Sequence, residues 1–353
     1  MPFSAVDSKG QTQDNLNQRE GSVLRHVVYN FIQTAVPVGS RFISRRFESH
    51  LSPATIRNVM SDLEEAGFLS HPHTSAGRVP TDLGYRYYVD YLMEVEQLSN
   101  TDRETIKSQL AGTTDPTELL RETSRLLGKI THHLSIVTSP QLNAGIFERL
   151  ELVPVSSSKI LVIISIRSGL VRTIMLEVGA ELRRDVLEQV GRLLNERLSG
   201  LTLLQVRDSF ADRVRDLQDE STGLIRLFIE SVDQLFTDAR EREKVHIGGT
   251  ANIIEQPEFV DPRKFRSVIE LVENEEIIVH LLERHDEVAK DVVVTIGSEN
   301  TGDAAEISVM TATYDVSGAT GRVGIIGPKR MNYAKMIPMV DHVARTIARI
   351  LAS

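Results

Sequence analysis

The chain has 353 residues, of which 41% are hydrophobic and 25% charged, a globular composition whose length predicts two or three domains. It contains no cysteine, which excludes disulfides, thiolate nucleophiles and cysteine-based zinc or iron–sulfur sites. The sequence has no run of about 18 apolar residues that would predict a membrane span, and its polar start lacks the apolar stretch of a signal peptide. We therefore expect a cytoplasmic protein with no membrane association.

The net charge of -9 is unevenly distributed along the chain. Residues 19–86 contain eight arginines, no lysine and six acids, which gives this segment a net charge of +2. Residues 87–353 carry a net charge of -10. This asymmetry predicts a small basic module attached to a larger acidic body, so the acidic total does not exclude nucleic-acid binding.

The chain begins with a polar segment followed by a helical pattern. Residues 1–18 are rich in Gln, Asn, Asp and Ser and show no apolar periodicity, so we expect a disordered leader. Apolar residues at helical spacing then predict a first helix of about 15 residues that begins near Arg19. Pro37 and Gly39 end this segment.

A short second helix is predicted directly after Gly39, with Ser40 as its cap. Its inward side is expected to be apolar and consists of Phe42, Ile43 and Phe47. Its outward side is expected to be basic and consists of Arg41, Arg45 and Arg46.

A third helix is predicted from a strong start signal, because Ser52 suits the N-cap and Pro53 suits the first helical position. Apolar residues that repeat at helical spacing form its inward face, namely Ile56, Val59, Met60 and Leu63. Gly67 ends the helix. Residues 68–73 and 78–80 then predict two short strands around a polar tip, and Thr81 can cap a helix that runs toward Leu98. Three helices, a hairpin and a further helix form a winged helix-turn-helix.

The remaining residues predict an α+β domain interrupted by a mostly helical insertion. Apolar periodicity predicts helices near 115–133, 181–198, 224–236, 262–274 and 333–351. Apolar runs predict strands near 134–137, 160–166, 171–178, 245–247, 292–296, 307–313 and 323–326. The expected division of the chain is a leader over 1–18, a DNA-binding domain over 19–100, an α+β domain over 101–179 and 241–353, and the insertion over 180–240.

The third helix has the features of a helix that reads a DNA groove. Such helices present their first turns to base edges, and arginine and asparagine side chains suit bidentate contacts with guanine and adenine. The free backbone donors at its start can hold a phosphate, and the arginines of the second helix would grip the DNA backbone. The small residues, histidines and arginine of the predicted wing suit phosphates or a minor groove. The predicted DNA-binding residues are Ser40, Arg41, Arg45, Arg46, Ser52, Thr55, Arg57, Asn58, His73, Thr74, Ser75 and Arg78.

The sequence predicts no catalytic residue, no cofactor and no metal. His71 and His73 are spaced as half of a metal site, but no third ligand follows at a recognisable spacing. Nucleotide-binding glycine loops, a nucleophile elbow and a metalloprotease helix are all absent from the sequence. The glycine-rich residues 318–324 lead into a strand and not a helix, so we interpret them as a turn between strands.

Five blocks of the sequence resemble the HrcA family of heat-inducible transcription repressors. They are Pro-Val-Gly-Ser-Arg at 37–41, the start of the third helix at 51–64, the wing at 73–81, and residues 255–259 and 324–333. Lys329 differs from the small polar residue that we expect there from the family pattern. The resemblance begins near residue 19 and extends to the C-terminus.

The resemblance implies a winged-helix domain, a GAF-like domain and an inserted dimerising domain. It also implies a homodimer that binds an inverted-repeat operator, called CIRCE, in double-stranded DNA upstream of chaperonin and other heat-shock operons. In such a system the chaperonin keeps the repressor active, and stress diverts the chaperonin to unfolded proteins.

Two other interpretations stay open from the sequence alone. The GAF-like domain could sense a small molecule, because such folds often hold ligand pockets, although fold alone does not establish function. An enzyme with a DNA-binding appendage is the third interpretation, and we disfavour it because no catalytic motif is present. We expect a repressor and not an enzyme.

Overall fold

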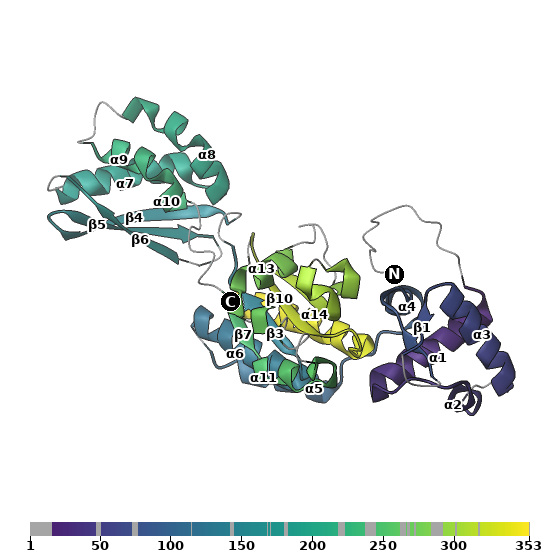
Figure 1. Cartoon of the computed structure of the whole chain (residues 1–353). Coiled ribbons are helices and arrows are strands. Elements are labelled where there is room, and N and C mark those ends of the chain that lie inside the picture. The colour runs from purple at the N-terminus through teal and green to yellow at the C-terminus, as the bar shows by residue number, and fades with distance from the viewer. Residues whose placement is uncertain are drawn as a thin grey trace. The chain divides into compact units, whose positions relative to one another are not determined.

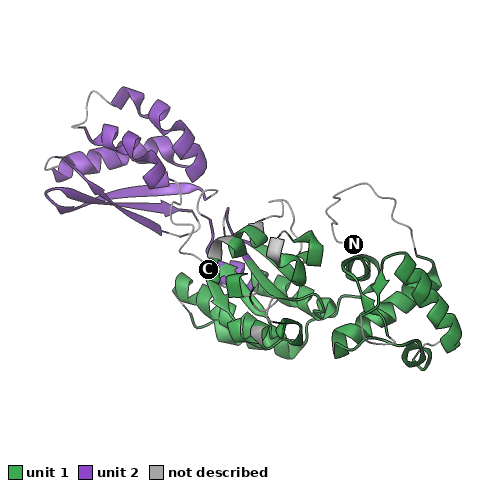
Figure 2. Cartoon of the chain, viewed as in Figure 1, with its two compact units in different colours: residues 1–137, 246–313, 323–344 green, residues 138–245, 314–322, 345–353 purple. Residues whose placement is uncertain are grey.

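The computed structural model divides the chain into two compact units (Figures 1 and 2). Unit 1 comprises Met1–Val137, His246–Thr313 and Val323–Ala344, and unit 2 comprises Thr138–Val245, Tyr314–Arg322 and Arg345–Ser353. The structure describes residues 16–46, 51–72, 77–113, 115–141, 145–167, 169, 171–179, 183–217, 223–236, 245–261, 266, 269–271, 273–283, 292–300, 302–316 and 318–352. Within these residues, no helix combines the length and the apolar character needed to cross a membrane.

Unit 1 begins with a group of elements that we call the head. They are α1 (Gln18–Thr34), α2 (Ser40–Ser44), α3 (Pro53–Glu65), β1 (Leu69–Ser70), β2 (Val79–Pro80), α4 (Asp82–Tyr87) and the π-helical turn η1 (Tyr88–Leu92). α1, α2 and α3 pack on one another around fully buried side chains that include Leu24, Ile43 and Ile56. β1 and β2 pair in antiparallel fashion, with Leu69 opposite Pro80.

Two helix boundaries in the head differ from the sequence predictions. α1 begins one residue earlier than expected, because Asn17 caps it in a reciprocal pair with Glu20. The predicted leader at residues 1–15 lies outside the described residues. The helix predicted to run from Thr81 toward Leu98 ends at Leu92, where the π-helical turn closes.

The rest of unit 1, which we call the body, is built on a five-stranded sheet with the order β7-β3-β10-β9-β8. The strands are β3 (Leu134–Thr138), β7 (Val245–Gly248), β8 (Val293–Ile296), β9 (Ile307–Val316) and β10 (Ala319–Pro328). The helices are α5 (Asn100–Leu110), α6 (Pro116–Thr131), α11 (Thr250–Ile254), α13 (Glu275–Glu283) and α14 (Tyr333–Leu351), with short turns η5 (Pro257–Phe259), η6 (Gly297–Glu299) and η7 (Gly302–Glu306). β9 and β10 are buried along most of both faces, the pattern of a sheet covered on two sides.

Unit 2 contains a three-stranded antiparallel sheet with helices over one of its faces (Figure 1). Its strands are β4 (Phe147–Ser156), β5 (Lys159–Ile166) and β6 (Val171–Glu177). Its helices are α7 (Arg184–Leu198), α8 (Leu203–Arg213), α9 (Leu224–Glu230) and α10 (Val232–Phe236), with the turn η3 (Arg215–Leu217). The strands and the helices share one apolar core, since Val162 of β5 and Leu194 of α7 belong to the same buried cluster as Phe210 of α8. For this reason β5 and β6, which sequence patterns grouped with the α+β domain, lie in the same unit as the helices of the insertion.

Most predicted strands and long helices are confirmed. The prediction that the glycine-rich segment 318–324 is a turn between strands is wrong for most of its length, because β10 begins at Ala319 and only Gly318, with a φ of +92°, stands in the turn. The sequence analysis missed α5, β4, α8 and the short α11, and the single helix expected over 224–236 is two helices, α9 and α10. The helix expected near 262–274 lies in part outside the described residues.

His133, which follows α6, is a buried titratable group of the body and leads to a stability prediction. Its pKa is lowered from 6.5 to about 4, chiefly by burial and also by the nearby charges of Arg330 and His132. His133 therefore binds a proton near pH 6.5 in the unfolded chain but only near pH 4 in the folded chain. The free energy of unfolding that this difference contributes at neutral pH is lost as the pH falls from 6.5 to about 4. The loss is at most about 3 kcal/mol.

We expect the free energy of unfolding, followed by chemical denaturation, to fall less between pH 7 and pH 4 in His133→Gln than in the wild type. Substitution of the exposed His280 by Gln is the control for the removal of a histidine. Equal pH dependence in the wild type and His133→Gln would contradict the prediction.

Candidate nucleic-acid interface

α3 begins with the cap that its sequence predicts. The hydroxyl of Ser52 accepts a hydrogen bond from the backbone N–H of Thr55 at 3.1 Å, and Pro53 occupies the first turn. One stripe of the helix is buried, as expected, and consists of Ile56, Val59, Met60 and Leu63. The opposite side of the first two turns is therefore directed to solvent.

Arg57 and Asn58 lie on this exposed side of α3. Neither side chain has an ion pair or side-chain hydrogen bond among the described residues, and no acid stands three or four positions from Arg57 along the helix. Thr55 differs from them, because its hydroxyl lies 2.9 Å from that of Ser52 and so takes part in the local cap. Arg57 and Asn58 thus have the exposure that contacts with DNA bases require.

α2 adds exposed cations beside α3, against which it packs. Arg41 and Arg45 are both exposed and have no acidic partner among the described residues. They stand four positions apart, a like-charge spacing that destabilises a helix by a few tenths of a kcal/mol unless an anion lies nearby. A phosphate bound nearby would therefore stabilise these two arginines in their helical positions.

Arg46 has intramolecular partners that the sequence did not predict. Its Nη1 donates to Oδ1 of Asn30 at 3.0 Å, and its guanidinium lies 4.5 Å from the ring centroid of Phe42. The prediction that Phe42 points inward is wrong, because its side chain is 41% exposed while the neighbouring Ile43 is fully buried. A helix of one turn directs only one of two consecutive side chains into the core. The predicted partner Phe47 lies outside the described residues.

Ser40 has a different local role from the one predicted. It is the first helical residue of α2, and the N-cap is Gly39, which makes no side-chain cap. The prediction that Ser40 caps this helix is therefore wrong, whereas its contact with DNA stays a prediction.

The wing is joined to α3 by a cluster of polar side chains. Nε of Arg78 lies 2.8 Å from Oε2 of Glu64, a residue in the last turn of α3. His71 lies between the same two side chains, with Nδ1 next to the Glu64 carboxylate and Nε2 next to Arg78. Because Arg78 donates to Nε2, the proton of a neutral His71 ring belongs on Nδ1, from which it donates to Glu64. Arg78 is only 14% exposed and so holds the wing against α3.

A backbone contact also anchors the wing. Val38 and Arg78 exchange two backbone hydrogen bonds of 2.9 Å, which adds a bridge beside the β1–β2 pair. At Gly77 any Cβ would lie 2.7 Å from the carbonyl carbon of Pro37, so only glycine permits this approach. The remaining predicted wing contacts, His73, Thr74 and Ser75, lie outside the described residues.

Metal chemistry finds no support in the part of the chain that the structure describes. It contains no group of three or more histidine and acidic side chains that could hold a metal ion.

Comparison with known proteins identifies the family. The model of the HrcA protein C-terminal domain matches residues 117–337. The chain is 42% identical to the heat-inducible transcription repressor HrcA of Chlorobium phaeobacteroides strain BS1 over 96% of this chain and 99% of the relative. It is 42% identical to the protein of the same name from Prosthecochloris aestuarii over 94% of this chain and 96% of the relative.

A crystal structure of a hypothetical protein at 2.2 Å resolution has a similar fold. The two chains align with a TM-score of 0.60 and 24% identity over 96% of this chain and 99% of the other. The mixed α+β architecture of the chain thus has an experimental counterpart. The family match and the extent of the sequence identity together mean that the chain belongs to the HrcA family.

Proposed function

We propose that this protein is a heat-inducible transcription repressor that binds operator DNA through its head. The observation that carries the proposal is the capped, solvent-facing start of α3, which presents Arg57 and Asn58 beside the exposed arginines of α2. The head then acts as a winged helix-turn-helix, with α3 in the major groove and the β1–β2 hairpin as its wing. The names of the relatives support the repressor role.

The proposal divides the DNA contacts into two classes. Arg57 and Asn58 read base edges, because arginine and asparagine match guanine and adenine in the major groove. Arg41 and Arg45, together with Ser52 and the start of α3, contact phosphates and set the register of the head on the duplex. Arg46, Thr55 and Arg78 belong to the proposed interface as well, and each also contacts a residue of the head, namely Asn30, Ser52 and Glu64, respectively. Ser40, His73, Thr74 and Ser75 complete the proposed interface.

We further propose that the protein is a homodimer formed through the uncovered face of the β4-β5-β6 sheet. Across this face Val153, Leu161 and Met175 form one cross-strand row, and the next rows carry Ile163 and Val171. Val171 is 56% exposed and Met175 is 44% exposed, although the other face of the same sheet is buried beneath helices. A second copy of the same face would remove this apolar surface from water and give the two-fold symmetry that an inverted-repeat operator requires.

This proposal assigns roles to the parts of the chain. The head is the DNA-binding domain that the sequence predicts over 19–100. The body is the GAF-like domain, and unit 2, with its sheet and its helices, is the inserted dimerising domain. The operator is the CIRCE inverted repeat of heat-shock operons, and the chaperonin maintains repression in the cytoplasm until heat stress withdraws it.

Transcription in vitro from a promoter that overlaps an inverted repeat tests the proposal. We expect the purified protein to lower transcript yield from this promoter but not from one with both half-sites scrambled, and added chaperonin to strengthen repression. Repression indifferent to chaperonin would contradict the chaperonin link and favour a small-molecule signal. Equal yield from both promoters would contradict the repressor role.

Arg45→Ala tests the phosphate contacts. Because phosphate contacts carry no sequence information, we expect weaker binding to operator and scrambled duplex by the same factor, and a slope of log K against log salt that is smaller by about 1. Arg103→Ala, which removes an exposed arginine from α5, is the matched control and should leave both quantities unchanged. A loss confined to operator DNA would mean that Arg45 reads bases instead.

A further inference from the structure

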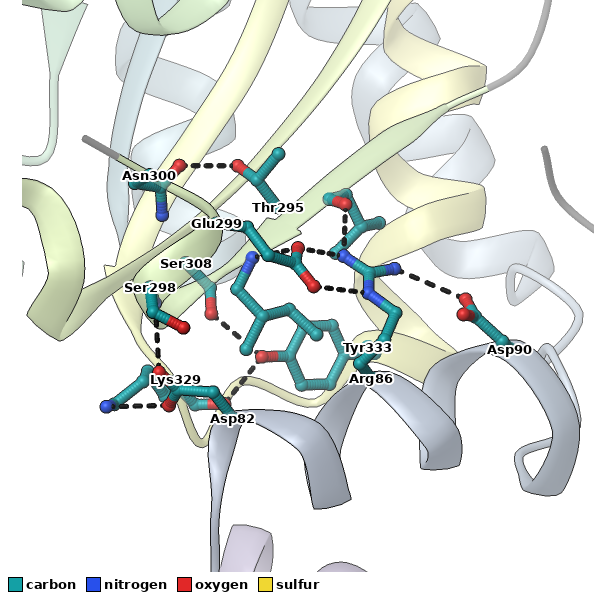
Figure 3. A network of polar contacts seen from close by, with 12 residues as sticks. Asp82, Arg86, Asp90, Thr295, Ser298, Glu299, Asn300, Ser308, Lys329 and Tyr333 are labelled. Atoms are coloured by element: carbon teal, nitrogen blue, oxygen red, sulfur yellow. Dashed lines mark hydrogen bonds and ion pairs between the residues drawn. The ribbon is translucent and has the colours of Figure 1, made fainter. Parts of the chain in front are cut away.

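Arg86 of α4 joins the head to the body through several hydrogen bonds (Figure 3). Its Nε donates to Oε1 of Glu299 at 2.7 Å, its Nη2 donates to the backbone carbonyl of Val294 at 2.7 Å, and Nη2 also contacts the second oxygen of Glu299. Its Nη1 donates to Oδ1 of Asp90 at 3.2 Å. The Arg86 side chain is 22% exposed and that of Asp90 only 7%, so these charges are largely removed from water.

Asp82, at the start of the same helix, makes the second connection. Its Oδ1 lies 2.8 Å from Nζ of Lys329, and its Oδ2 accepts a hydrogen bond of 2.9 Å from the backbone N–H of Ser298. Burial alone would raise the pKa of Asp82, but the hydrogen bonds from Lys329 and Ser298 hold it below its ordinary value. Gly297 permits the close approach, because a Cβ there would lie 2.3 Å from the Asp82 carboxylate and its φ is +55°.

The segment of the body that receives α4 is itself fixed by hydrogen bonds. The backbone N–H of Ile296 donates to Oε2 of Glu299 at 2.9 Å, which orients the carboxylate toward Arg86. The hydroxyl of Thr295 donates to Asn300 at 2.7 Å, and the amide of Asn300 donates to the carbonyl of Ile307 at 3.0 Å. The turn is therefore held on the sheet by contacts independent of the head.

Tyr333 supports the strand end that carries Lys329. Its hydroxyl donates to the backbone carbonyl of Lys329 at 2.6 Å and lies 2.9 Å from the hydroxyl of Ser308 (Figure 3). Its ring centroid lies 6.3 Å from that of Tyr85, which belongs to α4. Lys329, the residue that departs from the expected family pattern, thus stands at a contact with the head.

α4 is also attached to the rest of the head. Thr81 caps α4 through a hydrogen bond of 3.1 Å from the backbone N–H of Gly84. A Cβ at Gly84 would lie 2.2 Å from the carbonyl oxygen of Phe68, so the helix packs directly on the chain that leaves α3. Beyond α4 the backbone N–H of Met93 donates to the carbonyl of Tyr88 at 2.8 Å and closes the π-helical turn that carries Asp90.

We propose that these contacts form a positioning clamp that fixes the DNA-binding head on the body. The clamp consists of Asp82 and Arg86 of α4 together with Ser298, Glu299 and Lys329 of the body. It rests on the proposed function, because its effect on DNA binding arises through a dimer that carries two heads. In such a dimer the clamp restricts the movement of each head relative to its own body, and so narrows the range of separations at which the two α3 helices meet successive half-sites of an inverted repeat.

The location of the clamp separates positioning from DNA contact. Its side chains lie on α4 and on the body, whereas the exposed Arg57 and Asn58 lie on α3. Release of the clamp therefore leaves the binding of one head to one half-site unchanged. It lowers the effective concentration of the second head at the second half-site. When the geometry is fixed, this effective concentration raises the affinity for the inverted repeat by a factor of about 10² to 10⁴.

The test uses the full-length protein with the double substitution Glu299→Ala and Lys329→Ala. Three duplexes are titrated: a single half-site, the inverted repeat, and an inverted repeat with altered spacing between half-sites. We expect the affinity for the half-site to be unchanged and the affinity for the inverted repeat to fall by about tenfold or more. Altered spacing should lower the affinity of the variant less than it lowers the affinity of the wild type. Lys329→Met alone is the milder second variant and should shift each quantity in the same direction.

Glu258→Ala is the matched control, because Glu258 pairs with Arg330 inside the body and its side chain is 27% exposed, as that of Lys329 is. Three results would each overturn the clamp. They are equal losses of affinity for the half-site and the inverted repeat, unchanged or tighter binding to the inverted repeat, and the same effect from the control. Failure of the wild type to prefer the inverted repeat over the half-site would instead contradict the proposed function.

Discussion

Met175→Glu is expected to convert the proposed dimer into monomers and to remove most of the affinity for an inverted repeat. Met175 lies in the apolar row across β4, β5 and β6, opposite Leu161 of the central strand. In a monomer the new carboxylate stands on a 44% exposed position of β6 and is hydrated, so the fold tolerates it. Between two copies of the sheet face it would be buried without a partner, which costs several kcal/mol.

The oligomeric state is measured by light scattering after gel filtration, and the operator affinity by titration of the same samples. We expect monomers at concentrations where the wild type is dimeric, and a loss of affinity approaching the factor of about 10² to 10⁴ that two linked heads provide. Leu204→Glu is the matched control, because Leu204 is 43% exposed on α8 of the same unit. A Met175→Glu protein that stays dimeric would exclude the sheet face as the interface.

Arg57→Ala is expected to weaken operator binding by about 1 to 3 kcal/mol and to relax the sequence preference of the protein. Arg57 stands on the solvent-facing side of α3, close to the capped start of the helix. A bidentate contact between arginine and guanine is specific to the base, so its loss affects operator DNA more than scrambled DNA. The helix itself is little perturbed, because alanine is the best helix former.

Titration of operator, scrambled and singly substituted duplexes measures this effect. We expect one position in each half-site to lose its discrimination in Arg57→Ala, whereas Arg103→Ala retains it. An equal loss of affinity on all duplexes would mean that Arg57 contacts phosphate and not base.

The sequence predicted α3 accurately because the signals that define this helix are local. Ser52, Pro53 and the buried stripe act within 13 residues, and no distant contact overrides them. The exposure of Arg57 and Asn58 follows from the same periodicity. This part of the candidate DNA interface could therefore be predicted from the sequence.

The elements that the sequence analysis missed have weak or interrupted patterns. β4 has register irregularities near Phe147 and near Pro154, which break the alternation of apolar and polar side chains that predicts a strand. α8 is short, yet it carries a reciprocal cap between Thr202 and Gln205 that could have predicted its start. Both elements are stabilised chiefly by the shared core of unit 2.

The contacts of single side chains were less predictable than the elements. Arg78 is the type of residue that contacts DNA phosphates, but its side chain pairs with Glu64 and His71 because folding brings the wing against the end of α3. Arg86 and Glu299 are 213 positions apart, and no local pattern links them. Contacts between distant segments depend on the tertiary fold and do not follow from periodicity or caps.

The most direct test of the central claim is a mobility-shift titration of the purified protein on an inverted-repeat operator and on a scrambled duplex of the same composition, at two salt concentrations. We predict tighter binding to the operator at both, with a selectivity that persists at the higher salt because base contacts are not screened as phosphate contacts are. Equal affinity for the two duplexes would contradict the assignment of α3 as a sequence-reading helix.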